Sequence, residues 1–217
     1  MGALRYGHRL DPYDAHLVVN NFLLLITVKN HLRFHWNMPK GLKETSSPLV
    51  VSFTVAETAA NTFTTERVDL QLNALDNEVF VVTGVKMDLE MIDVQSGAGN
   101  LRYGIFASVS KQDITGQANS LSNPSVIATS NVQAMTDITA QPSGDNWGIS
   151  LIMQENDIDT PQALEYLDII ATPDFFVNIN GVSQQGAKSV AGKLYGYRAR
   201  ADASTYAALV QSELLSS

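Results

Sequence analysis

Residues 78–92 read Glu-Val-Phe-Val-Val-Thr-Gly-Val-Lys-Met-Asp-Leu-Glu-Met-Ile, and this stretch decides the class of the fold. Apolar side chains of one parity run through it: Val79, Val81, Val85, Met87, Leu89 and Met91. Charged side chains take the other parity: Lys86, Asp88 and Glu90. Alternation of this kind is typical of a strand with one buried face. The stretch therefore predicts one long β-strand, in which Gly84 marks a bend or a bulge.

Seven further stretches carry a strand signature, being rich in β-branched and aromatic residues and bounded by turn residues. They are Pro48–Ala56, Thr62–Leu72, Leu101–Lys111, Val126–Met135, Trp147–Gln154, Phe175–Ile179 and Val190–Ala201. Long amphipathic helices do not alternate with these strands, so a doubly wound α/β fold is not expected. The sequence predicts an all-β protein, an eight-stranded antiparallel β-sandwich, with a jelly roll favoured over an immunoglobulin-like Greek key.

Two segments depart from the strand pattern. Leu164–Ala171 is ambiguous between a short helix and a strand. Beyond Asp202 and Ser204, either of which can cap a helix, apolar residues recur at helical spacing. These are Tyr206, Leu209, Val210 and Leu214. A helix of about 10 residues is not stable alone, so we expect it to dock on the sandwich or on a neighbouring molecule.

The chain is acidic and poor in charge. Charged residues make up 17% of its 217 residues, against about 25% in an average protein, while Ser, Thr, Asn and Gln together number 59. Charge is depleted where surfaces meet other subunits, so this composition suits self-assembly as well as it suits a secreted β-protein. A net charge of −8 argues against an electrostatic nucleic-acid binder. The lack of Cys excludes disulfides, thiolate zinc sites and a cysteine nucleophile.

Residues 1–37 differ in composition from the rest. They contain all four histidines of the chain and carry four basic and two acidic side chains, whereas residues 38–217 carry 10 and 20. Three interpretations stay open: an over-long start ahead of a true start at Met38, an arm that reaches a neighbouring subunit, or a targeting segment. The apolar run Phe22–Val28 is too short to span a membrane, and no transmembrane segment follows. We expect residues 38–217 to form a single β-sandwich domain.

Three carboxylates at alternate positions form the one candidate metal site, Glu155, Asp157 and Asp159. Hard oxygen ligands at this spacing suit calcium. The Gly and the distant Glu of a calcium loop are missing from the matching positions, so a solvated acidic loop is favoured, and a glycosidase pair is the weakest alternative. No nucleophile–base pair can be built without His or Cys after residue 37. We expect no catalytic residues, no enzymatic activity and no cofactor other than calcium.

Four residues of the last predicted strand are candidates for an interface. Tyr195 and Tyr197 share one parity, and Arg198 and Arg200 share the other. Aromatic side chains anchor interfaces, and the two arginines can pair with the acidic loops of a neighbouring copy of this acidic chain. Stacking of the tyrosines on a carbohydrate ring is the alternative role.

The strand pattern, the absence of catalytic side chains, the neutral polar surface and the closing segment Lys193–Ala201, followed by a short helix, resemble small jelly-roll capsid proteins of viruses. The resemblance covers residues 45–217. It implies a major capsid protein located in the virion, which self-assembles into capsomers (pentamers, hexamers or trimers) and then into an icosahedral shell, with other capsid proteins as further partners. Members of this family have no active site, and their functional residues form interfaces.

One departure from that family is the first segment. Many small capsid proteins carry a strongly basic arm that neutralises the genome, whereas residues 1–37 have only a small excess of basic side chains. Strong nucleic-acid binding is therefore not expected. The alternative function is carbohydrate binding by a lectin-like β-sandwich or by a virion fibre or tail module.

Overall fold

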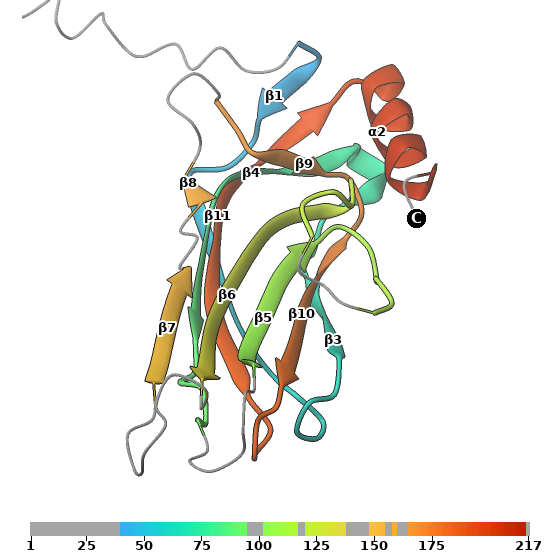
Figure 1. Ribbon diagram of the computed structural model, residues 1–217. Helices are drawn as coiled ribbons and strands as arrows, with labels where there is room; N and C mark the ends of the chain where they lie inside the picture. The colour runs from blue at the N-terminus through green and yellow to red at the C-terminus, as the bar shows by residue number, and fades with distance from the viewer. Residues whose placement is uncertain are drawn as a thin grey trace, which may run out of the picture. The chain divides into compact units, whose positions relative to one another are not determined.

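The computed structural model describes residues 40–94, 102–116, 120–137, 148–154, 158–159 and 165–215. These residues form two antiparallel β-sheets in a sandwich-like arrangement, followed by the helix α2 (Ala203–Leu215) (Figure 1). The predicted all-β sandwich with a short C-terminal helix is thereby confirmed. Residues 1–37 lie outside the described residues, so the three interpretations of that segment stay predictions.

The two sheets differ in size. Sheet A contains six strands: β1 (Leu42–Glu44), β2 (Leu49–Ala56), β4 (Glu78–Leu89), β8 (Ile158–Asp159), β9 (Asp168–Ile170) and β11 (Ser189–Ala201). Sheet B contains five strands, in spatial order β3 (Thr64–Asp69), β10 (Asp174–Val182), β5 (Arg102–Ser110), β6 (Val126–Asp137) and β7 (Gly148–Gln154). A 3-10 helix, η1 (Ala74–Asp76), lies between β3 and β4. All eight predicted strand regions contain a strand, β1 and β8 are additional, and β9 resolves the ambiguous segment as a strand.

The pairing of the strands is nested. β2 pairs with β11, β3 with β10, β4 with β9 and β5 with β6, always antiparallel. The first strand of this series therefore lies beside the last, and the second beside the second last. β11 also pairs with β4, and β10 with β5, which joins the four pairs into two sheets. The chain changes sheet at each step from β2 to β5 and again from β9 to β11.

The main core fills the space between the two sheets. Phe53 of β2 and Phe175 of β10 meet edge to face with ring centroids 5.9 Å apart. Two glycines of β11 make room for aromatic rings of the neighbouring strands. A Cβ atom at Gly192 would overlap the ring of Phe53, and one at Gly196 would overlap the ring of Phe80. β11 can therefore carry only glycine at these two positions while the rings stay in place.

A bulge in β4 exchanges the faces of that strand. Tyr195 pairs with Gly84 but Gly196 pairs with Val82, so Thr83 is an extra residue in β4. This confirms the bulge predicted at Gly84. The prediction that Val79, Val81 and Val85 share one face is wrong, because the extra residue reverses the parity. The core-facing residues are Phe80 and Val82 before the bulge and Val85 and Met87 after it.

The displaced valines belong to a second, smaller core on the outer side of sheet A. This cluster contains Val79, Val81, Ile169, Ala171, Tyr197, Ala199 and Ala201, all of them buried. Tyr206, Leu209 and Val210 of α2 pack against it. The helix therefore docks on the sandwich, as one of the two predicted arrangements required, and covers an apolar strip that the bulge creates.

Asp202 caps the amino end of α2, as predicted. Its Oδ1 atom accepts hydrogen bonds from the Thr205 amide at 2.7 Å and the Ser204 hydroxyl at 2.8 Å. These bonds hold the pKa of the Asp202 carboxyl below its usual value. An aspartate at this position also interacts favourably with the helix dipole, so the cap fixes the direction in which the helix leaves β11.

Glu213 fastens the other end of the helix. Its buried carboxylate accepts hydrogen bonds from the amides of Ala171 at 2.8 Å and Thr172 at 3.1 Å, in the connection between β9 and β10. Burial raises the pKa of the Glu213 carboxyl, although these bonds and the nearby Lys111 oppose the shift. The folded protein thus binds this proton more tightly than the unfolded chain does, so the helix docks more stably when the carboxyl is protonated.

The fold makes a prediction for Glu213. Replacement Glu213→Ala leaves two buried amides without an acceptor and should lower the free energy of unfolding by about 1–3 kcal/mol. Replacement Glu213→Gln keeps one acceptor and removes the charge, so it should cost less. Urea unfolding from about pH 4 to about pH 7 measures both. As the pH rises through the raised pKa, the wild type should lose stability relative to Glu213→Gln. A difference in unfolding free energy between the wild type and Glu213→Gln that does not change with pH would contradict the raised pKa of Glu213.

Candidate functional site

The predicted calcium site lies largely outside the described residues. Glu155 and Asp157 are not described, and of Asp159 only the backbone is, where it pairs with Gly84 of β4. Within the described ranges no three acidic or histidine side chains gather in a way that could hold a metal ion. Calcium binding by Glu155, Asp157 and Asp159 therefore stays a prediction.

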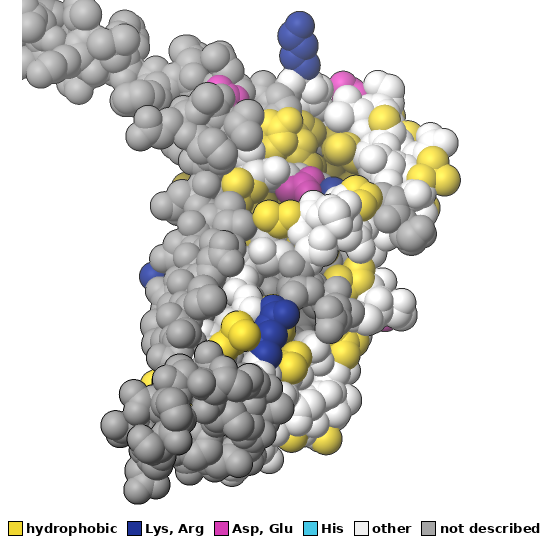
Figure 2. All heavy atoms as spheres, viewed as in Figure 1, with side chains coloured by type: hydrophobic (Ala, Val, Ile, Leu, Met, Phe, Trp, Pro, Cys, Tyr) yellow, Lys and Arg dark blue, Asp and Glu magenta, His cyan; other side chains and the backbone are white. Residues whose placement is uncertain are grey.

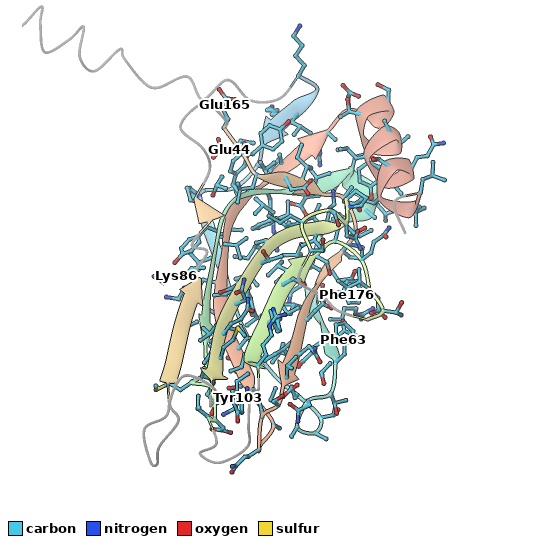
Figure 3. All side chains as sticks on the ribbon, viewed as in Figure 1. Glu44, Phe63, Lys86, Tyr103, Glu165 and Phe176 are labelled. Carbon is cyan, nitrogen blue, oxygen red and sulfur yellow. The ribbon has the colours of Figure 1, made fainter. Side chains whose placement is uncertain are left out.

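The two interface tyrosines of β11 lie on the outer side of sheet A but differ in exposure. Tyr195 exposes 36% of its surface, whereas Tyr197 exposes 8% and belongs to the second core. Burial raises the pKa of the Tyr197 phenol, and the carboxylates of Glu44 and Glu165, labelled at one end of the sandwich in Figure 3, act in the same direction. Tyr195 is therefore the more accessible of the two to a ligand or another molecule.

The two interface arginines find partners within the chain. Arg198 donates from Nη2 to the Leu70 carbonyl at 3.0 Å, and its Nη1 lies 4.0 Å from a Glu78 carboxylate oxygen. Arg200 Nη2 lies 2.7 Å from Asp76 Oδ1. Both side chains thus hold the connection between β3 and β4 against β11. Pairing with the acidic loops of another copy would have to compete with these contacts.

An apolar patch lies on the outer side of sheet A around Tyr195. Val50 of β2 stands directly opposite Tyr195 and exposes 53% of its surface, and the neighbouring Leu49 exposes 36%. Val50 and Tyr195 are adjacent on one face of two paired strands, so they form a contiguous surface rather than scattered apolar residues. Contiguous apolar surface of this kind is typical of a place where another molecule binds.

A hollow of about 340 Å³, lined by both apolar and polar residues, continues this surface along the same strands. Ser52 and Thr54 of β2, Lys193 of β11, and Lys86 and Asp88 of β4 line it. Lys193 lies directly opposite Lys86, whose side chain points away from the sandwich in Figure 3. Like charges in opposite positions repel each other across a sheet. Lys193 is exposed, so it is the group at this hollow that an anionic partner would contact, and Asp88 offsets part of its positive charge.

A second candidate surface crosses sheet B. Thr65, Asn178, Ser108 and Thr129 stand opposite one another on four adjacent strands. Asn178 is fully buried, and its Nδ2 atom donates to the hydroxyl oxygens of Ser108 at 3.2 Å and Ser110 at 2.9 Å. We call these five residues the polar row. Their alternation predicts strands, but the sequence does not reveal that the row is buried.

Two polar atoms of the row are unsatisfied. The Asn178 Oδ1 and Thr65 Oγ1 atoms are buried and find no hydrogen-bond partner among the described residues. Next to the row, Phe176 lies in register with Ser110, and Phe106 with Asn180. Figure 3 labels Phe176, which comes from β10. A hydroxyl group or a water molecule beside each of these oxygen atoms would satisfy it.

No protein-family model matches the chain, and no curated protein sequence is significantly similar to it. Of the helices that the structure describes, none is long and apolar enough to cross a membrane. The candidate surfaces therefore rest on the geometry of the sheets alone.

The polar row makes a prediction about stability. Replacement Thr65→Val removes a buried hydroxyl that bonds to nothing described and keeps the β-branched shape. It should leave the free energy of unfolding unchanged or raise it by up to about 1 kcal/mol. The matched replacement Ser108→Ala removes a hydroxyl that accepts from Asn178 and should lower stability by about 1 kcal/mol. Chemical denaturation of both variants measures the contrast. A larger loss in Thr65→Val than in Ser108→Ala would show that Thr65 has a partner.

Proposed function

We propose that this chain is a structural virion protein with a jelly-roll fold, a major capsid protein that assembles into capsomers and then into an icosahedral shell. The observation that carries the proposal is the nested pairing of β2 with β11, β3 with β10, β4 with β9 and β5 with β6. This pattern arises when one long antiparallel hairpin folds over into two sheets. Four strands of each sheet connected in this order are the pattern expected of a jelly roll, a fold used by viral capsid proteins and by lectins.

The composition of the surface favours assembly over a monomeric state in solution. Neutral polar and hydrophobic side chains make up most of the described face in Figure 2, with charged ones scattered among them. The apolar patch of Val50 and Tyr195 adjoins the hollow beside Lys193, here called the lysine hollow, on sheet A. A chain of net charge −8 offers acidic partners for such a hollow on its own copies. Copies of the same chain, in trimers, pentamers or hexamers, are the partners we propose, with other capsid proteins beside them.

Carbohydrate binding is the second candidate function, and the polar row favours it. Amide and hydroxyl side chains bind sugar hydroxyls, and aromatic rings pack on the apolar side of a sugar ring. Asn178 and Thr65 supply two unsatisfied but buried oxygen atoms, which a sugar would reach only by displacing what covers the polar row, and Phe176 and Phe106 supply the rings. Jelly rolls include lectins, so this function needs no different architecture.

The assembly function is tested by light scattering and negative-stain microscopy on the full chain. Discrete rings or closed shells are expected, and the particles should depend on salt if the lysine hollow contacts an acidic partner. A comparison of residues 1–217 with residues 38–217 shows whether the first segment takes part. A protein that stays monomeric at high concentration, in both low and high salt, would contradict the proposal.

The carbohydrate function is tested by thermal unfolding against a panel of glycans. A ligand that binds only the folded state stabilises it by about 2.7 kcal/mol at 100 times its dissociation constant, so binding raises Tm. Replacement Asn178→Ala should abolish the shift relative to its own unliganded Tm. Replacement Tyr195→Ala, on the opposite sheet, is the control and should leave the shift unchanged. If Tyr195→Ala rather than Asn178→Ala abolishes the rise in Tm, the sugar binds on sheet A.

A further inference from the structure

β2 is an edge strand of sheet A in the part of the chain that the structure describes. It pairs with β11 along residues 49–56, and no strand in the described part of the chain pairs with its other edge. The short β1 pairs with the far end of β11, at residues 199–201, and so does not cover β2. An unpaired edge presents a row of backbone donors and acceptors to which another strand can bind.

The free backbone groups of this edge can be assigned. The Glu57 amide donates to the Lys188 carbonyl at 2.8 Å, just beyond the last pair of the β2–β11 ladder, Ala56 with Ser189. In antiparallel pairs, residues that bond to the partner strand alternate with residues that do not. Odd-numbered residues of β2 therefore bond to β11. The amides and carbonyls that point to the open edge are those of Val50, Ser52, Thr54 and Ala56.

The open edge lacks the features that normally keep such edges apart. Natural edge strands carry charged residues, proline or a bulge. The sequence of β2, Leu-Val-Val-Ser-Phe-Thr-Val-Ala, has no charge and no proline, and its pairing with β11 runs without a break. β3, an edge strand of sheet B, shows the contrast: its six residues include Glu66, Arg67 and Asp69. The edge of β3 is protected by charge and that of β2 is not.

A second copy of this chain is the partner that fits the edge best. Two molecules of net charge −8 repel each other, and β2 itself brings no charged side chain to the contact, the nearest being Lys193 on the neighbouring strand. The side chains beside the edge can pack against the same side chains of a second copy. Ser52 and Thr54 are small, polar and exposed, and Val50 and Tyr195 are apolar and partly exposed. Covering them would bury the patch on sheet A.

We propose that β2 pairs antiparallel with β2 of a second copy about a two-fold axis, so that sheet A continues through both molecules. Closed two-fold symmetry places the same strand on both sides of the contact. With Ser52 opposite Thr54 of the second copy and Val50 opposite its Ala56, all four free residues of each copy form hydrogen-bonded pairs. This contact goes beyond the proposed capsid function, because it depends only on the edge and forms whether or not a shell does.

Amide hydrogen exchange of the full chain tests the pairing directly. In a monomer the amides of Val51, Phe53 and Val55 are bonded to β11 and should exchange slowly, whereas those of Ser52 and Thr54 should exchange freely. At concentrations where sedimentation shows a dimer, Ser52 and Thr54 should become protected at least about tenfold. Free exchange of these two amides in the dimer, or a wild type that stays monomeric at every concentration, would overturn the proposal.

Substitutions at the edge give an independent test. Replacement Thr54→Pro removes one free amide without touching a bond to β11, which an edge strand tolerates. The double replacement Ser52→Lys with Thr54→Lys gathers four positive charges about the two-fold axis. Both should weaken dimerisation at least about tenfold in sedimentation equilibrium, with unchanged circular dichroism. The control Thr54→Val keeps the amide and should dimerise like the wild type. If Thr54→Pro fails to fold, the double lysine variant decides.

The outcomes separate this proposal from the capsid function. Folded double lysine variants that dimerise like the wild type would overturn the β2 contact and point to β7, the other long strand edge without charge. Shells that form while Ser52 and Thr54 exchange freely would leave the capsid function standing and remove the β2 contact. Dimers with protected edge amides and no larger particles would establish the contact and contradict the shell.

Discussion

The close approach of aromatic rings to the backbone of β11 is the constraint on which the rest of the structure depends. β11 pairs with β1 and β2 on one side and with β4 on the other, so it is the strand around which sheet A forms. Gly192 and Gly196 let the rings of Phe53 and Phe80 lie against it. Any larger residue at either position would push a ring out of the core, separate β2 or β4 from β11, and disturb both candidate surfaces of sheet A.

Buried carboxylates hold the two ends of the sandwich in the same way. At one end Glu57 accepts hydrogen bonds from the amides of Gly181 at 2.6 Å, Lys188 at 2.9 Å and Thr62 at 3.1 Å. It thereby joins the turn after β2 to the turn between β10 and β11. At the other end Glu213 joins α2 to the turn before β10. Each carboxylate accepts hydrogen bonds from backbone amides that are not bonded to a neighbouring strand. These bonds fix the turns, which have little apolar surface of their own.

Alternation in the sequence located the strands because it reports which residues face the core, and the core is continuous here. It could not show that Thr83 is an extra residue, so it placed Val79 and Val81 on the wrong face. Alternation correctly placed Arg198 and Arg200 on one face of their strand. It could not identify their acceptors, which lie at residues 70–78 and are distant in sequence. The polar row was missed for a similar reason, because a polar residue in a strand looks solvent-facing until the neighbouring strands bury it.

The nested pairing also governs when the protein can fold. The buried bond between Glu57 and the Lys188 amide joins residues 131 positions apart, and β2 gains its partner only when β11 has left the ribosome. At about 5–20 residues per second, the ribosome needs about 7–26 s to add the 131 residues that separate these two partners. During this interval β2 and β4 have no strand between them, although β4 can already pair with β9 once β9 has been made. The β2–β11 ladder therefore forms late, and until then β2 is an unpaired apolar strand of the kind that exposes a chain to aggregation.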